Sequence, residues 1–306
     1  MADRLRPTTA LSAHQRDGIR LSPQGEAFLA TLDERAWKLL DEHDLRWDGV
    51  LGNGEYSVTM MCTMRVDGRR VVLKLDPEIN RLANQCRVQK VWARQGVAPH
   101  ISYEEAGVCI MDWVPAGYST WRSDKATRNI RTTTAALETA WHAPGLVDDL
   151  RPGKFWWVFR ICRARLSEMA AERGDEAVSL PLTDESFDRA QLMIDELRTL
   201  QPAGVCHGDP TVANILRENS GKIWLIDPLP SADPLICGLA HWSCRARTGH
   251  SAENILRRAL TRVDTSVSED EIRGWLAFHT IAPVTSLLVR GEDIPAEMLK
   301  NLEPLR

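Results

Sequence analysis

Three polar residues at fixed spacing, Asp209, Asn214 and Asp227, constrain this 306-residue chain more than any other feature. Asp209 and Asn214 belong to the run His-Gly-Asp-x-x-x-x-Asn-Ile-Leu, and Asp227 follows the apolar run 223–226. Such a set suits phosphoryl transfer, in which one carboxylate orients or deprotonates a hydroxyl while an amide oxygen and a second carboxylate hold Mg²⁺. A lone Asp in a loop is usually a turn or capping residue, but the joint pattern favours the chemical role.

The neighbours of Asp209 have structural interpretations. His207 has no proton to move in this chemistry, so we expect it to hydrogen-bond the backbone of the loop. Gly208 is expected to permit a tight backbone path, because glycine reaches conformations that other residues avoid. Cys206 is expected to be a small buried side chain and not a nucleophile.

These motifs resemble those of the aminoglycoside phosphotransferase-like kinases, relatives of the protein kinases, and they span residues 51–234. The resemblance implies that Asp209 is the catalytic base and that Asn214 and Asp227 are Mg²⁺ ligands. It also implies that Lys74, in the run Val-Val-Leu-Lys-Leu, contacts the phosphates of ATP, or of GTP in its place. The Asp-Pro pairs at 227–228 and 233–234 are most similar to the streptomycin and hydroxyurea branch.

The fold class that the resemblance implies is α+β, a bilobal protein-kinase-like fold. Residues 1–115 are expected to form the N-terminal lobe, a small antiparallel sheet with a helical extension that binds nucleotide. Residues 116–306 are expected to form a larger, mainly helical C-terminal lobe with the catalytic loop and the substrate pocket. The run Pro-Ala-Gly at 115–117 breaks the pattern between the lobes.

Local patterns predict elements of both lobes. Alternating apolar residues at 58–66, the pair Asp67-Gly68 and the apolar run 71–75 predict an antiparallel hairpin. Thr183 and the capping box Ser-Glu-Asp-Glu at 268–271 predict the starts of two later helices. Two further helices are expected at residues 23–43 and 77–95, and two further strands at residues 101–103 and 108–113.

Gly52 and Gly54, with Ser57 behind them, lie between two predicted strands. That position argues against a Rossmann fingerprint or a Walker A loop, because both of those motifs open a helix. It is typical of a glycine-rich flap over ATP phosphates, although a simple hairpin turn has the same pattern. Lys74 favours the flap, because a lysine on a buried strand is rare unless its charge is used.

Kinases of this family usually place a Glu on the next helix to form an ion pair with that lysine. Here Gln85 takes the position, and Glu78, at the start of the helix, is the alternative. Glutamine can hydrogen-bond Lys74 without neutralising it. The backbone groups of Asp112 and Val114 are expected to pair with the adenine edge. The expected nucleotide site therefore comprises Gly52, Gly54, Ser57, Lys74, Gln85, Asp112 and Val114.

The acceptor is expected to bind to the helical lobe and to present a hydroxyl to Asp209. The candidate anchors for a cationic substrate are acidic residues, each of which is individually more often a solvated surface charge: Asp148, Asp149, Asp233 and Glu271. Trp242 is a candidate to line the pocket, although most tryptophans lie in cores. These residues do not define the substrate.

Composition limits the compartment and the partners. With 43% hydrophobic and 26% charged residues, the chain is an ordinary soluble protein, and a net charge of −4 offers no basic surface for nucleic acid. Residues 1–21, expected to be loose or peripheral, lack the apolar core of a signal peptide, and no run of about 18 apolar residues predicts a membrane span. Seven cysteines without a C-x-x-C pair predict free thiols in a reducing cytoplasm. The sequence carries no signal for oligomeric state.

The leading hypothesis is an ATP-dependent small-molecule O-phosphotransferase that phosphorylates a hydroxyl of an antibiotic and so inactivates it. One alternative is a metabolic kinase for a small alcohol, amino alcohol or sugar. A third hypothesis is a pseudokinase that binds nucleotide as a regulatory module. Gln85 invites the third hypothesis, whereas the intact Asp209, Asn214 and Asp227 oppose it.

Overall fold

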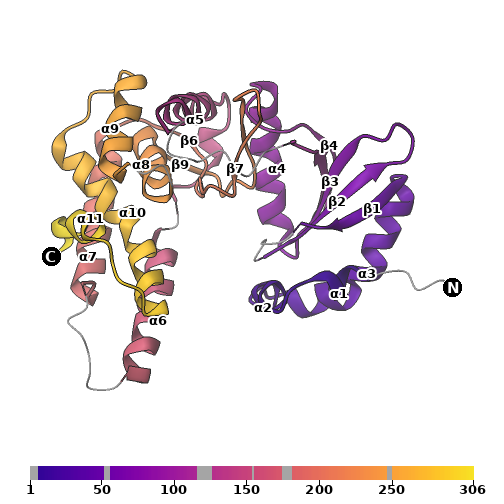
Figure 1. Ribbon diagram of the computed structural model, residues 1–306, viewed down its shortest axis with the longest axis horizontal. Coiled ribbons are helices and arrows are strands. Elements are labelled where there is room, and N and C mark those ends of the chain that lie inside the picture. The colour runs from indigo at the N-terminus through magenta and orange to yellow at the C-terminus, as the bar shows by residue number, and fades with distance from the viewer. Residues whose placement is uncertain (1–5, 52–55, 116–125, 154, 174–180, 247–249) are drawn as a thin grey trace. The chain divides into compact units, whose positions relative to one another are not determined.

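The computed structural model describes residues 6–51, 56–115, 126–153, 155–173, 181–246 and 250–306 (Figure 1). The chain divides into two compact units, Met1–Pro115 and Ala116–Arg306. Gly52 and Gly54, predicted to cover the nucleotide phosphates, lie outside the described residues.

The first unit is built on a five-stranded antiparallel sheet with the strand order β1-β2-β3-β5-β4. Its strands are β1 Leu45–Val50, β2 Val58–Met64, β3 Arg70–Leu75, β4 Ile101–Glu105 and β5 Val108–Asp112. The predicted hairpin is confirmed, because β2 and β3 pair in a register that places Val58 opposite Leu75 and Thr63 opposite Arg70. Gly68 in the connecting turn has a φ of +73°, in the left-handed region that glycine adopts readily.

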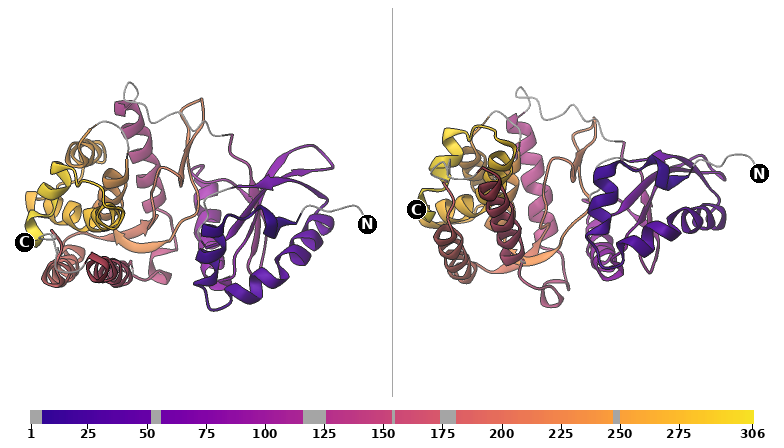
Figure 2. Two further views of the ribbon diagram at one scale, coloured as in Figure 1. Left: turned by 60° about the horizontal axis from the view of Figure 1, so that its bottom comes forward. Right: turned by 90° about the horizontal axis from the view of Figure 1, so that it is seen from below.

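Two helices, α3 (Gly25–Glu42) and α4 (Ile79–Arg94), cover opposite faces of this sheet (Figures 1 and 2). Successive side chains of a strand point to opposite faces. Leu73 and Leu75 of β3 therefore lie in the core shared with α3, whereas Val72 packs with the residues of α4. Lys74 also points to α4, and this orientation determines which groups can reach its ammonium.

The expectation of a loose N-terminal segment is wrong for residues 7–20, which form two helices. These are α1 Pro7–Ala10 and α2 Ala13–Arg20. Leu11 and Ile19 are buried in the core beside α3, so the segment gains apolar burial. Ser12 and Gln15 form a capping box that starts α2, with both reciprocal hydrogen bonds at 3.1 Å.

The second unit is mainly helical and carries two short pairs of antiparallel strands. Its helices are α5 Ala126–Trp141, η2 Val147–Asp149, α6 Phe155–Arg173, α7 Asp184–Leu200, α8 Leu235–Arg245, α9 Ala252–Arg262, α10 Glu269–Arg290, α11 Ala296–Asn301 and η3 Glu303–Leu305. The paired strands are β6 Ala203–Cys206 with β9 Ser231–Pro234, and β7 Ile215–Arg217 with β8 Ile223–Leu225. Both predicted helix starts are confirmed, since Thr183 and Ser268 cap α7 and α10.

Helix α10 is the central helix of the second unit. It packs against α6, α7 and α8, and Trp275 on it is fully buried. By length and composition alone α10 could cross a membrane, but 67% of its most apolar stretch is buried inside the protein. Such burial is typical of the core helix of a soluble protein.

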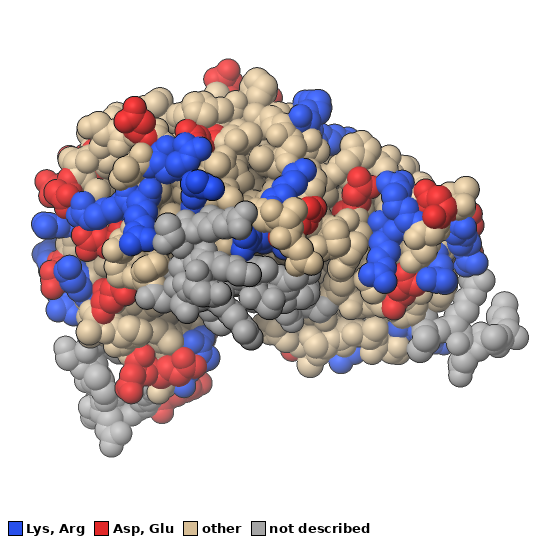
Figure 3. Space-filling model, turned by 45° about the horizontal axis from the view of Figure 1, so that its top comes forward, with Lys and Arg blue, Asp and Glu red and all other residues tan. Residues whose placement is uncertain are grey.

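Charges and thiols are distributed as in an ordinary globular protein. Basic and acidic side chains are interspersed on the face in Figure 3. All seven cysteines lie in the described residues and are free thiols, and six of them are buried.

Candidate active site

The loop that carries Asp209 follows directly from β6 and is tied to the segment after Asp227. The main-chain N–H of Asp209 donates to Nδ1 of His207 over 3.3 Å, and the His207 carbonyl accepts from the Leu229 N–H over 2.8 Å. Gly208 has a φ of +76°, and a Cβ there would lie 1.8 Å from the Leu229 carbonyl oxygen. No other residue fits at that position, as expected from the sequence.

Asn214 fixes the carboxylate of Asp209. Its Nδ2 group donates to Oδ2 of Asp209 over 2.8 Å and to the Asp209 carbonyl over 3.0 Å. Since both amide hydrogens serve Asp209, the amide oxygen of Asn214 is directed away from that pair. Both residues are half-buried.

The β7–β8 hairpin places Asn214 and Asp227 at the same end of a strand pair. Ile215 lies opposite Leu225, and the Ile226 N–H donates to the Asn214 carbonyl over 3.0 Å. Asp227 follows with a φ of +50°, in the left-handed region that residues other than glycine rarely occupy. Such conformations are frequent at functional sites.

The donor set of this end of the hairpin fits Mg²⁺. The amide oxygen of Asn214 and the carboxylate of Asp227 are hard oxygen ligands, which Mg²⁺ prefers. Within the described residues, no group of three or more His, Cys, Asp or Glu side chains could hold a metal. With Asn214 and Asp227 as its protein ligands, a hard cation here would take its other oxygen ligands from water and phosphate.

Three histidines, His207, His241 and His279, lie in the second unit, and His207 belongs to the loop that carries Asp209. Burial lowers the pKa of His207 to about 4, so its imidazole is neutral near pH 7 and Nδ1 can accept the hydrogen bond from Asp209. His241 on α8 and His279 on α10 stack with ring centroids 4.5 Å apart. Burial also lowers the pKa of His241, to about 3, and that of His279. His207 thus has the structural role that the sequence predicts.

In the first unit, Lys74 and Gln85 form the expected hydrogen bond. Lys74 is the penultimate residue of β3 and only 3% exposed, and its Nζ donates to Oε1 of Gln85 on α4 over 3.0 Å. Glu78 is instead the N-cap residue of α4 and lies 3.6 Å from Arg81. The helix register read from the sequence is therefore correct.

The remaining nucleotide-site candidates lie at strand ends. Ser57 is buried and directly precedes β2. Asp112 ends β5, where its N–H donates to the His100 carbonyl over 2.9 Å and its carboxylate pairs with Arg69. Val114 is buried two residues later.

Comparison with known proteins identifies the fold. No protein-family model and no curated protein matches the chain. Among solved structures, an ethanolamine kinase of Plasmodium vivax has a TM-score of 0.58 at 11% identity, covering 93% of this chain and 89% of the kinase. A choline kinase from Streptococcus pneumoniae has a TM-score of 0.56 at 12% identity, and the match covers 90% of this chain and 99% of the choline kinase. An ADP-bound aminoglycoside phosphotransferase has a TM-score of 0.54 at 14% identity, and the match covers 89% of this chain and 96% of the phosphotransferase.

The chain has the protein-kinase-like fold of these small-molecule kinases. The expected fold class is thereby confirmed, with an antiparallel sheet in the first unit and a helical second unit. The matching structures include both metabolic kinases and antibiotic kinases at similar TM-scores, so the fold does not distinguish the two classes of acceptor.

Within this kinase fold, three predicted substrate contacts occupy structural positions. Asp233 is buried and paired with Arg198, with Oδ1 and Nε 2.9 Å apart. Trp242 is fully buried in α8. Glu271 is buried and accepts from the N–H of Ser268, closing the capping box of α10. We correct the expected substrate role of these three residues, because none offers a side chain to solvent.

The other two acidic candidates keep an accessible position. Asp148 and Asp149 are exposed on η2, which lies against β6 and β9. No sequence pattern predicted that Arg198 and Trp141 lie beside the strand pair β6–β9. Both residues contact Asp233, from 35 and 92 positions away along the chain.

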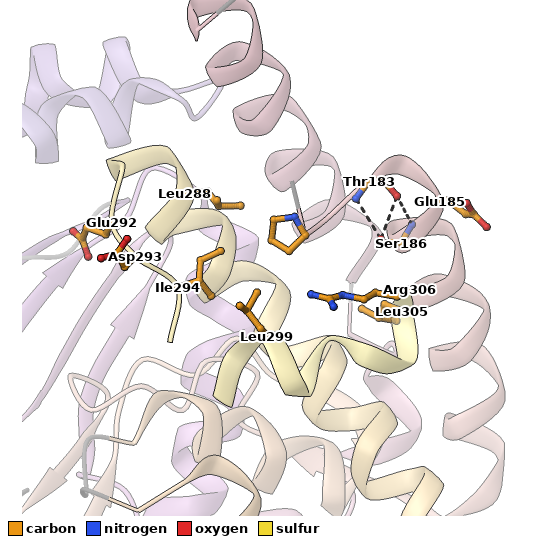
Figure 4. A pocket seen from close by; sticks show the side chains of 11 residues that line it. Thr183, Glu185, Ser186, Leu288, Glu292, Asp293, Ile294, Leu299, Leu305 and Arg306 are labelled. Atoms are coloured by element: carbon orange, nitrogen blue, oxygen red, sulfur yellow. Dashed lines mark hydrogen bonds between the residues drawn. The ribbon is translucent and has the colours of Figure 1, made fainter. Parts of the chain in front are cut away.

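A cavity of about 750 Å³ lies elsewhere in the second unit, between the start of α7 and the end of α10 (Figure 4). Its walls include Leu288, Ile294 and Leu299, and none of the predicted site residues lines it. The 17 residues of α7 span roughly 25 Å at about 1.5 Å per residue, and the end of α7 is the one that leads to β6. The cavity is therefore remote from the Asp209 loop.

Proposed function

We propose that this protein is a small-molecule O-phosphotransferase that uses ATP, or GTP in its place, with Mg²⁺. One observation carries the proposal: Asn214 holds the carboxylate of Asp209 and shares the end of a hairpin with Asp227. A kinase fold adds support, since the similar structures include kinases solved with ADP, AMP and GDP.

Each group has a role in direct transfer from the nucleotide to a hydroxyl. Asp209 orients the acceptor hydroxyl and takes its proton. Asn214 and Asp227 would hold Mg²⁺, which neutralises the charge that develops on the phosphates. Lys74 positions the phosphates, and Gln85 orients Lys74 by a hydrogen bond. The backbone at Asp112 and Val114 pairs with the adenine edge, and Ser57 belongs to the phosphate flap.

We propose an antibiotic as the acceptor, with a compact metabolic alcohol as the second candidate. A similar structure is a phosphotransferase in complex with gentamicin, and another is an ethanolamine kinase. The Asp-Pro pairs at 227–228 and 233–234 support the streptomycin and hydroxyurea branch. Exposed Asp148 and Asp149, next to the catalytic strand pair, suit a cationic acceptor.

The free, mostly buried thiols and the buried α10 support a soluble protein of the cytoplasm. The mixed surface charge supports small molecules as ligands, with no nucleic acid and no membrane partner.

The test is an ATP-consumption screen with and without Mg²⁺. The panel comprises aminoglycosides, tuberactinomycin-type peptides, hydroxyurea, amino alcohols and sugars, with GTP as a second donor. An antibiotic kinase consumes ATP fastest with one antibiotic, whereas a metabolic kinase prefers a compact alcohol over every antibiotic. Nucleotide binding in a thermal-shift assay without consumption for any acceptor would support the pseudokinase instead.

A further inference from the structure

Strand β6, which leads into the catalytic loop, is held by side chains that the proposed mechanism does not use. It ends at Cys206, three residues before Asp209 (209 − 206 = 3). Its partner in a two-stranded sheet is β9, with Gly204 opposite Asp233. A strand of four residues has few hydrogen bonds of its own, so its position depends on the groups packed around it.

Arg198 and Asp233 tie β9 to two other segments of the second unit. The Asp233 side chain is 0% exposed, and its Oδ1 accepts from Nε of Arg198 over 2.9 Å. Its Oδ2 accepts from the Gly153 N–H over 3.0 Å, and Nη2 of Arg198 donates to the Gly153 carbonyl over 2.8 Å. The last turns of α7, the strand β9 and the residues before α6 therefore meet at one carboxylate.

Trp141 holds the same strand pair from the end of α5. Its Nε1 group donates to the carbonyl of Asp233 over 3.0 Å. Its ring covers Gly204, where a Cβ would lie 2.3 Å from the indole. The glycine is thus required by the indole and not by its backbone conformation. One side chain contacts both strands at the pair Gly204–Asp233.

We propose that Trp141 and Arg198 are positioning residues for Asp209, acting through β6 and β9. The inference rests on the proposed function, in which Asp209 orients the acceptor hydroxyl. Gly204 lies five residues before Asp209 (209 − 204 = 5), so the effect is transmitted through β6 and the loop that follows it. Catalytic geometry is sensitive to displacements of about 1 Å, and a strand held from three sides resists them.

The decisive variant is Trp141→Phe, which keeps an aromatic ring over Gly204 and removes the N–H that binds Asp233. The matched control is Trp275→Phe, the same change at a fully buried tryptophan on α10. We expect Trp141→Phe to lower kcat about fivefold, because the loss of one hydrogen bond corresponds to a factor of about this size. The KM values for ATP and for the acceptor should stay within about twofold of wild type. Trp275→Phe is expected to lower the melting temperature and leave kcat unchanged.

Amide hydrogen exchange supplies a readout that needs neither nucleotide nor acceptor. In Trp141→Phe, the protection of amides in residues 204–211 should fall about fivefold, whereas in Trp275→Phe it should not change. Unchanged exchange in Trp141→Phe, or an equal change in both variants, would overturn the proposal. Reduced protection of residues 204–211 in Trp141→Phe together with an unchanged kcat would overturn the proposal as well. If the wild-type protein phosphorylates no acceptor, the proposed function fails, and the exchange data still decide whether Trp141 holds the loop.

Discussion

At the scale of single residues, Lys74 has the most demanding environment. It is a cation that is 3% exposed on the central strand of a sheet, and Gln85 binds it through a neutral amide. Burying a cation is costly unless other groups compensate for the lost water. The hydrogen bond from Lys74 Nζ to Gln85 Oε1 holds the ammonium on the α4 side of the sheet.

We therefore expect Lys74 and Gln85 to be coupled in nucleotide binding. Lys74→Ala should weaken ATP affinity markedly, and Gln85→Ala should weaken it less. Gln85→Glu should be tolerated, because a charge-assisted hydrogen bond is stronger even though the added charge offsets part of the attraction to phosphate. Calorimetry on the double-mutant cycle should give a coupling energy of about 1 kcal/mol. Simple additivity of the two alanine substitutions would show that the contact does not serve ATP.

The environments of single residues were only partly predictable from the sequence. The partnership of Lys74 with Gln85 follows from helix register, which is a local property. Asp233, Glu271 and Trp242 were misassigned, because a residue type does not reveal its burial.

At the scale of elements, the β7–β8 hairpin creates the candidate metal site. Asn214 and Asp227 are separated by thirteen positions (227 − 214 = 13), and the hydrogen bond from Ile226 to Asn214 brings their backbones together. The left-handed backbone of Asp227 restricts the substitutions that leave the hairpin intact. Asparagine is a suitable replacement for Asp227, because it tolerates the left-handed conformation and lacks the negative charge of the carboxylate.

We expect Asp227→Asn and Asn214→Ala to weaken the dependence of nucleotide binding on Mg²⁺. Both changes remove an oxygen ligand or its charge, and Mg²⁺ binds poorly to neutral or incomplete sites. The measurement is ATP affinity as a function of Mg²⁺ concentration, with circular dichroism to verify the fold. An unchanged Mg²⁺ titration in either variant removes that residue from the site.

The start of α10 gives an independent test of local stability. The Oγ of Ser268 accepts from the Glu271 N–H over 3.2 Å, and Glu271 accepts in return from the Ser268 N–H. Ser268→Ala should lower the free energy of unfolding by about 1 kcal/mol, measured by urea denaturation. Ser286→Ala, in the same helix, is the control and should change it by less than about 0.5 kcal/mol. Equal effects of the two substitutions would contradict the capping role.

Elements with strong local signals were predictable, and those formed by distant pairing were not. The turn at Asp67-Gly68 and the caps at Thr183 and Ser268 are local signals, and all three predictions are confirmed. The pair β6–β9 has four residues in each strand and joins distant segments, so no local pattern reveals it. Helices α1 and α2 were missed although Ser12 and Gln15 carry a capping-box signature, because the segment is polar overall.

At the scale of the whole molecule, buried histidines link stability to pH. His207, His241 and His279 are neutral in the folded protein, since burial lowers their pKa values below the ordinary value of about 6.5. Arg245 and a neighbouring imidazole further disfavour the protonation of His241 and of His279. Below pH 6.5 the unfolded chain binds more protons than the folded one, so stability falls as pH falls.

We expect the urea midpoint to decrease between pH 7.5 and pH 5, a range in which few carboxylates titrate. With a folded pKa of about 4, His207 alone should cost about 2 kcal/mol at pH 5. Replacement of His241 by Gln should reduce the slope, because one titrating group is removed. A midpoint that stays constant from pH 7.5 to pH 5 would contradict the buried, neutral state of these side chains.

The most direct measurement of the central claim is phosphoryl transfer by wild type and Asp209→Asn, with the product followed by mass spectrometry on the best acceptor of the screen. The wild-type protein should add one phosphoryl group to the acceptor in the presence of ATP and Mg²⁺. Asp209→Asn should lower kcat by about 10²–10⁴ with ATP affinity within about threefold, because the carboxylate orients and deprotonates the hydroxyl and does not bind the nucleotide. Retention of more than about a tenth of the wild-type kcat would contradict the assignment of Asp209 as the base.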